Sequence, residues 1–310
     1  MDEPDRLSTR FEEHRTHLRA VAYRMLGSLS EAEDAVQDAW LRASRADTSE
    51  VVNLAGWLTT VVGRVCLNVL RSREQRREDP LDVHMPEPII SREDGVDPEH
   101  EALLADSVGL AMLMVLETLS PAERLAFVLH DMFAVPFEEI APMIEKSPAA
   151  TRQLASRARR RMQDQAPAPD PDLARQRKAV DAFFAAARKG DFDALVNVLH
   201  PEVVLRSDGG VARTRHTVTL RGAQVVASQA LTFSRLAPFA RPALINGVAG
   251  VVVIAKDRPL SIMAFTVTDG QVVSIEVLAD PARLQDLDLP VLDAPTPDPT
   301  DAPTTDPTAN

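Results

Sequence analysis

Apolar positions near the start of the chain recur three and four residues apart. Leu18, Val21 and Met25 belong to such a series, and no proline interrupts residues 11–77. This spacing places the apolar side chains on one face of a helix. The pattern predicts a helical domain over residues 1–77.

A proline-rich and acidic stretch follows over residues 78–98. Its prolines are Pro80, Pro86, Pro88 and Pro98. Proline lacks the backbone N–H and clashes with the preceding turn, so this stretch cannot hold a helix. We interpret it as a linker to a second helical block over residues 99–165.

Serine and proline divide the end of this second block into three helices. The expected helices begin at Ser120-Pro121 and run through Met132, begin at Pro136 and run through Glu145, and begin at Ser147-Pro148. Serine caps a helix N-terminus, and proline is tolerated in the first turn. Pro142 falls inside the second helix and is expected to kink or end it. The result is a short helix, a tight turn and a basic helix.

The apolar period changes after the proline-rich segment 166–171. Residues 172–199 keep helical spacing, but β-branched runs follow, separated by Asp-Gly, Asn-Gly and Arg-Pro turns. The runs cover residues 203–205, 217–220, 244–254, 260–267 and 272–278. An α+β domain is therefore expected over residues 172–286. Residues 287–310 have too little apolar content to pack and are expected to be disordered.

Composition narrows the class of protein. The single cysteine, Cys66, cannot form an internal disulfide or a cysteine-rich metal cluster, and no leader or membrane-spanning run opens the chain. We therefore expect a cytoplasmic protein with no cofactor, no metal and no membrane partner. The formal net charge of −12 disfavours a nucleic-acid partner, but residues 152–161 carry five arginines and no acid.

The basic helix after Ser147 has the residue types that a DNA-reading helix needs. Arginine and glutamine can contact base edges in the major groove, and further arginines can neutralise phosphates. The residues that we expect to face the DNA are Arg152, Gln153, Ser156, Arg157 and Arg160. By itself this pattern fits a solvated basic helix equally well. The helix and tight turn before it favour a helix-turn-helix.

Two blocks of the chain resemble the extracytoplasmic function (ECF) group of RNA polymerase sigma factors. The first comprises residues 32–42 (AEDAVQDAWLR) and the helix that opens with residues 56–62 (GWLTTVV). The second comprises residues 119–124 (LSPAER), residues 137–141 (FEEIA) and the basic helix. The resemblance covers residues 10–163 and implies promoter DNA and the polymerase core as partners.

This resemblance assigns roles to the first block. It implies that an acidic helix docks on the clamp helices of the polymerase largest subunits, through Glu33, Asp34, Gln37, Asp38 and Leu41. It also implies contacts to the −10 promoter element, from the loop 47–53 and the next helix, through Asn53, Trp57, Arg64, Asn68 and Arg71. A solvated acidic face and a core role for Trp57 are the alternatives that the pattern alone leaves open.

The third domain resembles the SnoaL-like fold, a helix packed on a curved sheet. Residues 180–195 and the His200-Pro201-Glu202-Val203 segment carry this resemblance. Such folds often enclose a pocket, so an unidentified small ligand stays open. His200, Asp208 and Asp257 are candidate polar groups of that pocket. The alternative is that His200 is a structural cap and that the aspartates belong to turns.

A narrower resemblance joins all three domains. ECF sigma factors with a SnoaL-like extension, the SigJ-like group, carry short motifs in the linker and in the extension. The matching residues here are Pro86, Glu87, Pro88, Asp208, Gly209, Gly210, Asp280, Pro281, Arg283 and Leu284. The resemblance implies that the extension contacts the sigma domains and regulates them in cis, through these residues.

We therefore expect two all-α sigma domains, the second with a helix-turn-helix, followed by an α+β SnoaL-like domain. The expected function is that of an alternative sigma factor and not of an enzyme. A SnoaL-like isomerase or cyclase with a helical adaptor is one alternative, but it would need a converging acid–base pair. A helix-turn-helix repressor is another, but it would need neither the acidic helix nor a second DNA-reading helix.

Overall fold

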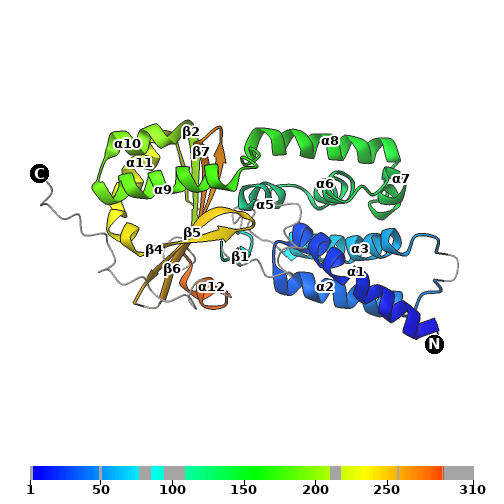
Figure 1. Ribbon diagram of the computed structural model, residues 1–310. Coiled ribbons are helices and arrows are strands. Elements are labelled where there is room, and N and C mark those ends of the chain that lie inside the picture. Colours follow the sequence, from blue (N-terminus) through cyan, green and yellow to red (C-terminus); the bar gives the residue numbers. More distant parts are fainter. Residues whose placement is uncertain are drawn as a thin grey trace, which may run out of the picture.

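The computed structural model describes residues 3–48, 51–76, 85–93, 109–209, 218–256, 258–287 and 289. Two helical units lie beside an α+β unit (Figure 1). The first helical unit contains α1 (Glu3–Leu26), α2 (Leu29–Ala43) and α3 (Leu54–Arg76), which pack against one another. Helix α2 is amphipathic, because it buries small apolar residues such as Ala32 and Val36 on one side only.

The second helical unit ends in the expected helix-turn-helix. Its elements are α5 (Leu110–Glu117), α6 (Pro121–Phe127), the π-helical turn η1 (Val128–Met132), α7 (Phe137–Ile140), the 3-10 turn η2 (Ala141–Met143) and α8 (Pro148–Gln165). The Ser120 and Ser147 side chains cap α6 and α8, which confirms both helix starts. Pro142 ends the helix as expected, because α7 stops at Ile140 and a 3-10 turn follows.

The third unit has the expected α+β composition. Its helical elements are α9 (Leu173–Lys189), α10 (Phe192–Val198), α11 (Ala223–Thr232), the 3-10 turn η3 (Ser234–Phe239) and α12 (Pro281–Gln285). The single helix expected over 172–199 is two helices, because Gly190 takes a left-handed conformation with φ of 69° and caps α9. The sequence analysis missed α11, whose mixed Ala, Gln and Val composition has no clear period.

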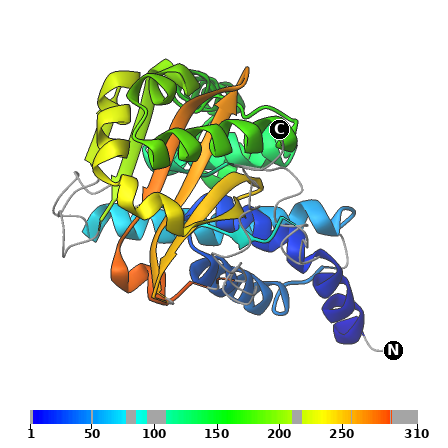
Figure 2. The ribbon, with the colours of Figure 1, turned by 60° about the vertical axis from the view of Figure 1, so that its left-hand side comes forward.

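In the described part of the chain, seven strands form one sheet in the order β1-β4-β5-β6-β7-β2-β3. They are β1 (Ile90–Ser91), β2 (Leu199–Asp208), β3 (Val218–Arg221), β4 (Ala240–Ile245), β5 (Val248–Ala255), β6 (Arg258–Thr268) and β7 (Gln271–Leu278). Neighbouring strands are antiparallel except β2 and β7, which are parallel. The sheet is strongly curved, and α9 and α11 cover one of its faces (Figure 2).

Two details of the expected strands were wrong. The run 244–254 is not one strand but the β4–β5 hairpin, whose turn residues Asn246 and Gly247 have φ of 51° and 77°. The Arg258-Pro259 pair is not a turn, because both residues lie in β6 and pair with β5. Lys256, with φ of 54°, turns the chain before them.

Residues 85–93, within the stretch interpreted as a linker, belong to the folded structure. They contribute β1, in which Ile90 lies opposite Ile245 and Ser91 opposite Leu244 of β4. Met85, Ile89 and Ile90 are all buried. This segment therefore adds an edge strand to the sheet of the third unit.

The two faces of the sheet belong to two different cores. On β5, Val251 and Val253 join the core beneath α9 and α11, whereas Val252 and Ile254 join a core that also contains both helical units. All but the last residue of β5 are buried, because successive side chains point to opposite faces. Helix α5 lies at the centre of the shared core and contacts α1, α8 and β7.

The start of the expected tail also packs. Leu289 is buried in the shared core, and Leu287 lies against it. Residues 290–310 lie outside the described residues, so the expectation of disorder there stays a prediction. Among the helices that the structure describes, none is long and apolar enough to cross a membrane.

A shared core predicts that the three units unfold together. Phe265 is fully buried between Phe183 and Phe184 in the core beneath α9, far in sequence from Trp40 and Trp57, the two tryptophans of the chain. Phe265→Ala is expected to lower the free energy of unfolding by about 3–5 kcal/mol because it leaves a cavity. Tryptophan fluorescence should report this loss in the same transition as circular dichroism. Val225→Ala, at an exposed position of α11, serves as control. A fluorescence transition left unchanged by Phe265→Ala would show that the units unfold separately.

Candidate functional site

The acidic side of α2 is largely open to solvent. Asp34, Gln37, Asp38 and Leu41 are exposed, and Leu41 is an apolar side chain with 45% of its surface accessible. Glu33 differs, because it is half-buried and forms ion pairs with arginines of α1. Four of the five residues expected to bind the polymerase are therefore available to a partner, with an exposed leucine among the acids.

The residues expected at the −10 element lie along α3. Arg64 and Asn68 are exposed and Arg71 is half-buried, at a spacing that places them on one side of the helix. Asn53 instead caps α3, since its Oδ1 accepts a hydrogen bond from the Gly56 amide at 3.0 Å. Trp57 is half-buried against the shared core. The structure thus brings together three of the five residues as one open face.

The outer face of α8 carries the residues expected at the −35 element. Arg152, Gln153, Arg157 and Arg160 are exposed and Ser156 is half-buried, while the opposite face packs on α6. The Arg152 guanidinium lies over the Phe137 ring, 5.3 Å from its centroid. Glu123 lies within ion-pair distance of Arg157 and Arg161. These contacts hold the arginines without covering them.

The two helical units pack directly on each other at Gly63 of α3. A Cβ added at Gly63 would lie 3.0 Å from side-chain atoms of Leu129 and Met143, which belong to the helix-turn-helix unit. Beside this contact Arg124 of α6 is buried and donates to the Arg24 carbonyl of α1 and to Glu117. A side chain at position 63 would therefore push the ends of Leu129 and Met143 aside by a few tenths of an ångström.

A segment between the units, residues 85–91, connects the first helical unit to the sheet, and we call it the brace. The Tyr23 hydroxyl of α1 donates to the Glu87 carbonyl at 2.6 Å and accepts from the Asn246 amide group at 2.8 Å. Asn246 also accepts from the Ile89 amide and donates its own amide proton to the Ile89 carbonyl. Tyr23 and Asn246 are both buried, and burial raises the pKa of the Tyr23 hydroxyl.

Glu87 ties the brace to the start of α2. Its carboxylate accepts hydrogen bonds from the Leu29 amide at 2.9 Å and from the Ser28 hydroxyl at 3.1 Å. A carboxylate at a helix N-terminus satisfies unpaired amides and complements the helix dipole. The helix with the acidic face is therefore capped by a residue of the brace.

Arg283 of α12 ties the brace to the third unit. It donates to the Met85 carbonyl at 2.6 Å and to the Asp208 carboxylate at 2.9 Å. The other residues expected at a regulatory contact divide as follows: Pro86 and Pro88 are buried in the brace, Leu284 is buried in the shared core, and Asp280 caps α12, which begins at Pro281. Gly209 lines a cavity described below, and Gly210 lies outside the described residues.

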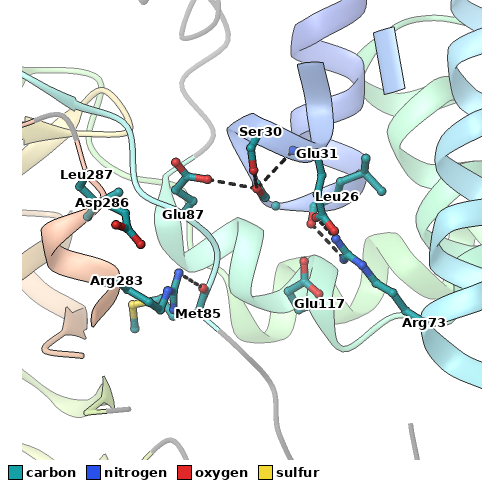
Figure 3. Close-up of a pocket in the computed structure, with 12 residues that line it drawn as sticks. Leu26, Ser30, Glu31, Arg73, Met85, Glu87, Glu117, Arg283, Asp286 and Leu287 are labelled. Atoms are coloured by element: carbon teal, nitrogen blue, oxygen red, sulfur yellow. Dashed lines mark hydrogen bonds and ion pairs between the residues drawn. The ribbon is translucent and has the colours of Figure 1, made fainter. Parts of the chain in front are cut away.

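The brace borders a pocket of about 760 Å³ where all three units meet, and Figure 3 shows its lining. Two of its acidic side chains form ion pairs: Glu31 pairs with Arg73 of the lining, and Glu117 pairs with the buried Arg124 behind it. Gly27 lies at its wall, where a Cβ would approach the Glu117 carboxylate to 2.7 Å. No group of three or more His, Cys, Asp or Glu side chains placed to hold a metal ion occurs in the described part of the chain.

A second cavity, of about 500 Å³, lies between the concave face of the sheet and α9, α11 and η3. Its described lining residues include no ionisable side chain. His200 and Asp208, two of the candidate polar pocket groups, are not among them, and Asp257 lies outside the described residues. The described lining therefore supplies no acid–base pair for the enzyme alternative.

The sequence analysis missed Tyr23, Gly63 and Asn246. Asn246 had one usable signal, because an Asn-Gly pair favours a hairpin turn with positive φ. Tyr23 is the one tyrosine of the chain, but its helical position identifies no partner. Contacts between distant segments leave no local pattern, so these roles required the structure.

Comparison with known families identifies both helical units. Residues 10–77 match Sigma-70 region 2, and residues 109–162 match Sigma-70, region 4. Together with the exposed acidic helix and the helix-turn-helix, these matches define the class as an RNA polymerase sigma factor.

Individual relatives extend the similarity across the third unit. The ECF RNA polymerase sigma factor SigJ of Mycobacterium tuberculosis is 40% identical over 288 residues, which cover 88% of this chain and 91% of that protein. The probable ECF sigma factor SigI of the same species is 34% identical over 93% of this chain and 98% of that protein. The crystal structure of M. tuberculosis SigJ matches 90% of this chain and 98% of that chain, with a TM-score of 0.71 and 36% identity.

The chain belongs to the ECF RNA polymerase sigma factors. It is an alternative sigma factor of transcription initiation, and its third unit is a SnoaL-like extension. The expected family, the fold class and the role as an alternative sigma factor are confirmed.

Proposed function

We propose that the SnoaL-like extension holds the two sigma domains in a closed arrangement that cannot read a complete promoter. The observation that carries this proposal is the direct contact of α3 with the helix-turn-helix domain at Gly63, where a Cβ atom would lie only 3.0 Å from side-chain atoms of Leu129 and Met143. The extension then regulates promoter recognition in cis, because recognition depends on how readily this contact opens.

The dimensions of promoter DNA support the closed state. The −10 and −35 elements lie roughly 25 base pairs apart by their names, which corresponds to about 85 Å of duplex. Here one helix, α6, separates α8 from α3 (Figure 1). Packed helix axes lie about 8–10 Å apart, so α3 and α8 are separated by roughly 20 Å. The two reading faces must therefore move apart before both elements can be bound.

The extension is well placed to resist that movement. The back face of its sheet shares a core with both sigma domains, and the brace adds buried hydrogen bonds from Tyr23 and Asn246. A flexible tether would favour contact between the extension and the sigma domains only by raising their effective concentration. A large apolar interface also fixes the position of the domains relative to one another. The polymerase and the promoter would have to offset this interface.

We assign the open faces to the partners that a sigma factor requires. The acidic face of α2 meets the clamp helices of the polymerase core, the exposed face of α3 contacts the −10 element, and the outer face of α8 reads the −35 element. The exposure of these side chains supports the assignment. A sigma factor works beside the polymerase, so we place the protein in the cytoplasm.

The core-binding assignment predicts the effect of charge reversal on α2. Asp34→Lys combined with Asp38→Lys should weaken association with core polymerase severely, since it replaces attraction for a basic partner by repulsion. Association can be measured by pull-down with folded protein. Glu138→Lys, an exposed acid on α7, is the control. Undiminished binding of the double variant would remove α2 from the interface.

The −35 assignment predicts two different effects along α8. Replacing a base-reading arginine by alanine should cost about 1–3 kcal/mol and relax preference at one position, whereas loss of a phosphate contact should weaken all sequences alike. Arg152→Ala and Arg157→Ala can be compared on a library of −35 sequences. Arg175→Ala, exposed on α9, is the control. If both variants matched the wild type at every position, α8 would not be the reading helix.

The closed-state proposal predicts that a weakened brace opens the sigma domains. Asn246→Gly tolerates the positive φ and removes the two side-chain hydrogen bonds, one to the Tyr23 hydroxyl and one from the Ile89 amide, while the backbone bond to Ile89 stays. Two hydrogen bonds at about 1 kcal/mol each should raise the open population roughly tenfold or more. Transcription from a dependent promoter should rise with it.

Cys66 supplies a direct readout of opening. It is fully buried on the side of α3 that carries Gly63, and burial raises the pKa of its thiol to about 12. Asn246→Gly should therefore speed its reaction with a chromogenic disulfide reagent. The control is Asp269→Gly, which also puts glycine at a turn position of positive φ, 52°, but in the β6–β7 turn. It should leave the rate of Cys66 modification unchanged. Equal Cys66 rates in wild type and Asn246→Gly would contradict the closed-state proposal.

A further inference from the structure

The cavity beneath α9 and α11 is large and mostly apolar, and we call it the concave cavity. It measures about 500 Å³, whereas one water molecule occupies about 30 Å³ in the liquid. Its walls are mainly aromatic and aliphatic side chains, among them Phe183, Phe184, Leu205, Leu220, Val253 and Met263. Protein interiors normally leave few voids larger than a water molecule.

We propose that the concave cavity binds an uncharged, largely apolar small molecule, and that its occupation stabilises the closed arrangement of the sigma domains. The second half of this inference rests on the proposed function, whereas the binding site stands independently of it.

Small residues keep the cavity open. Ala187, Ala230 and Ala237 line it from α9, α11 and η3, at positions where a larger apolar residue would fill the space. Val218 and Phe233 also line it and are 41% and 53% exposed, so they mark an apolar entrance. A cavity of this size lies in the range of small-molecule sites.

The lining chemistry defines the class of ligand. Ser207, Gln229, Ser234 and Ser261 are the polar side chains among the described lining residues, and all four are uncharged. A charged ligand would lose its hydration without gaining an ionic partner from these walls. Aromatic and aliphatic walls with a few hydroxyl and amide groups suit a ring or chain that carries one or two hydrogen-bonding groups.

The cavity wall is continuous with the brace. Ser207 and Gly209 line the cavity at the end of β2, and Asp208 between them binds Arg283, which holds the Met85 carbonyl. Neighbouring side chains of a strand point to opposite faces. The end of β2 therefore presents the cavity on one face and the brace on the other.

The end of β7 follows the same arrangement. Val277 and Ala279 line the cavity, and the Ala279 amide donates to the Asp208 carbonyl at 2.7 Å. The cavity exists with these strand ends in their closed-state positions. A ligand that fits this shape favours the closed state by its higher affinity for it.

Probe binding to the full chain tests the site. N-phenyl-naphthylamine is a neutral apolar fluorophore, and anilinonaphthalene sulfonate carries the same rings with a negative charge. We expect one saturable site for the neutral probe and at least tenfold weaker binding of the sulfonate. Equal affinities, or no saturable binding of the neutral probe, would overturn the proposed ligand class.

Matched variants on α11 locate the probe. Ala230→Phe fills the cavity and should weaken binding of the neutral probe at least tenfold, whereas Val225→Phe places the same ring on the exposed side and should not. Ser261→Asp, which puts a charge into the wall, gives a second test if Ala230→Phe fails to fold. Wild-type affinity in a folded cavity variant would place the probe elsewhere and overturn the site.

The rate of Cys66 modification tests the coupling. A saturating concentration of the neutral probe should slow the reaction at least threefold in the wild-type chain. By linkage, Asn246→Gly should weaken probe binding only in proportion to the closed fraction that it removes. Saturable binding with an unchanged Cys66 rate would overturn the coupling and leave the binding site. A Cys66 rate that Asn246→Gly itself does not raise would count against the closed state, while the probe and α11 variants still decide the site.

Discussion

Helix α5 is the constraint on which the arrangement of this sigma factor depends. It buries apolar side chains on every side, including Leu110, Leu113 and Leu116, and it contacts the first sigma domain, the reading helix and the sheet. A short helix that is apolar all round must be enclosed by protein. Here each of the three units supplies part of that enclosure, so the units cannot separate without exposing α5 to water.

Buried polar groups then define how the units meet. Apolar contacts are non-directional and tolerate several orientations, whereas the hydrogen bonds among Tyr23, Asn246 and the backbone of residues 85–91 fit one orientation only. Each bond adds little net stability, but a broken one leaves a buried group unsatisfied. The hydrogen bonds of the brace thus specify the orientation of the units, whereas the apolar shared core supplies most of the contact area.

This division suits the opening of the sigma domains that we propose. A closed state held by apolar area alone would open only when a partner covers equivalent area. Because Glu87 of the brace also caps α2, the segment that joins the first sigma domain to the sheet of the extension touches the helix that we assign to the polymerase. Docking on α2 and loosening of the brace would then influence each other through a shared residue.

Local patterns determined much of this protein. The proline and serine positions predicted the starts of α6 and α8, and Pro142 predicted the early end of α7, because capping and proline geometry act within one turn. The division of residues 172–199 at Gly190 and the helix α11 were missed, since weak local signals compete there with tertiary contacts. The Asn-Gly turn was expected, but the run 244–254 was wrongly drawn across it.

Only the tertiary structure decided which surfaces meet. The sequence of β5 does not distinguish the residues on its back face from those on its concave face, because both sets are apolar. Gly63 and Tyr23 acquire their roles from residues far away in the chain, namely Leu129 and Met143 for the glycine and Glu87 and Asn246 for the tyrosine. Local structure depends on residues that are neighbours along the chain, so it can be predicted from the sequence. The packing of the three units on one another depends on complementary surfaces that exist only after each unit has folded.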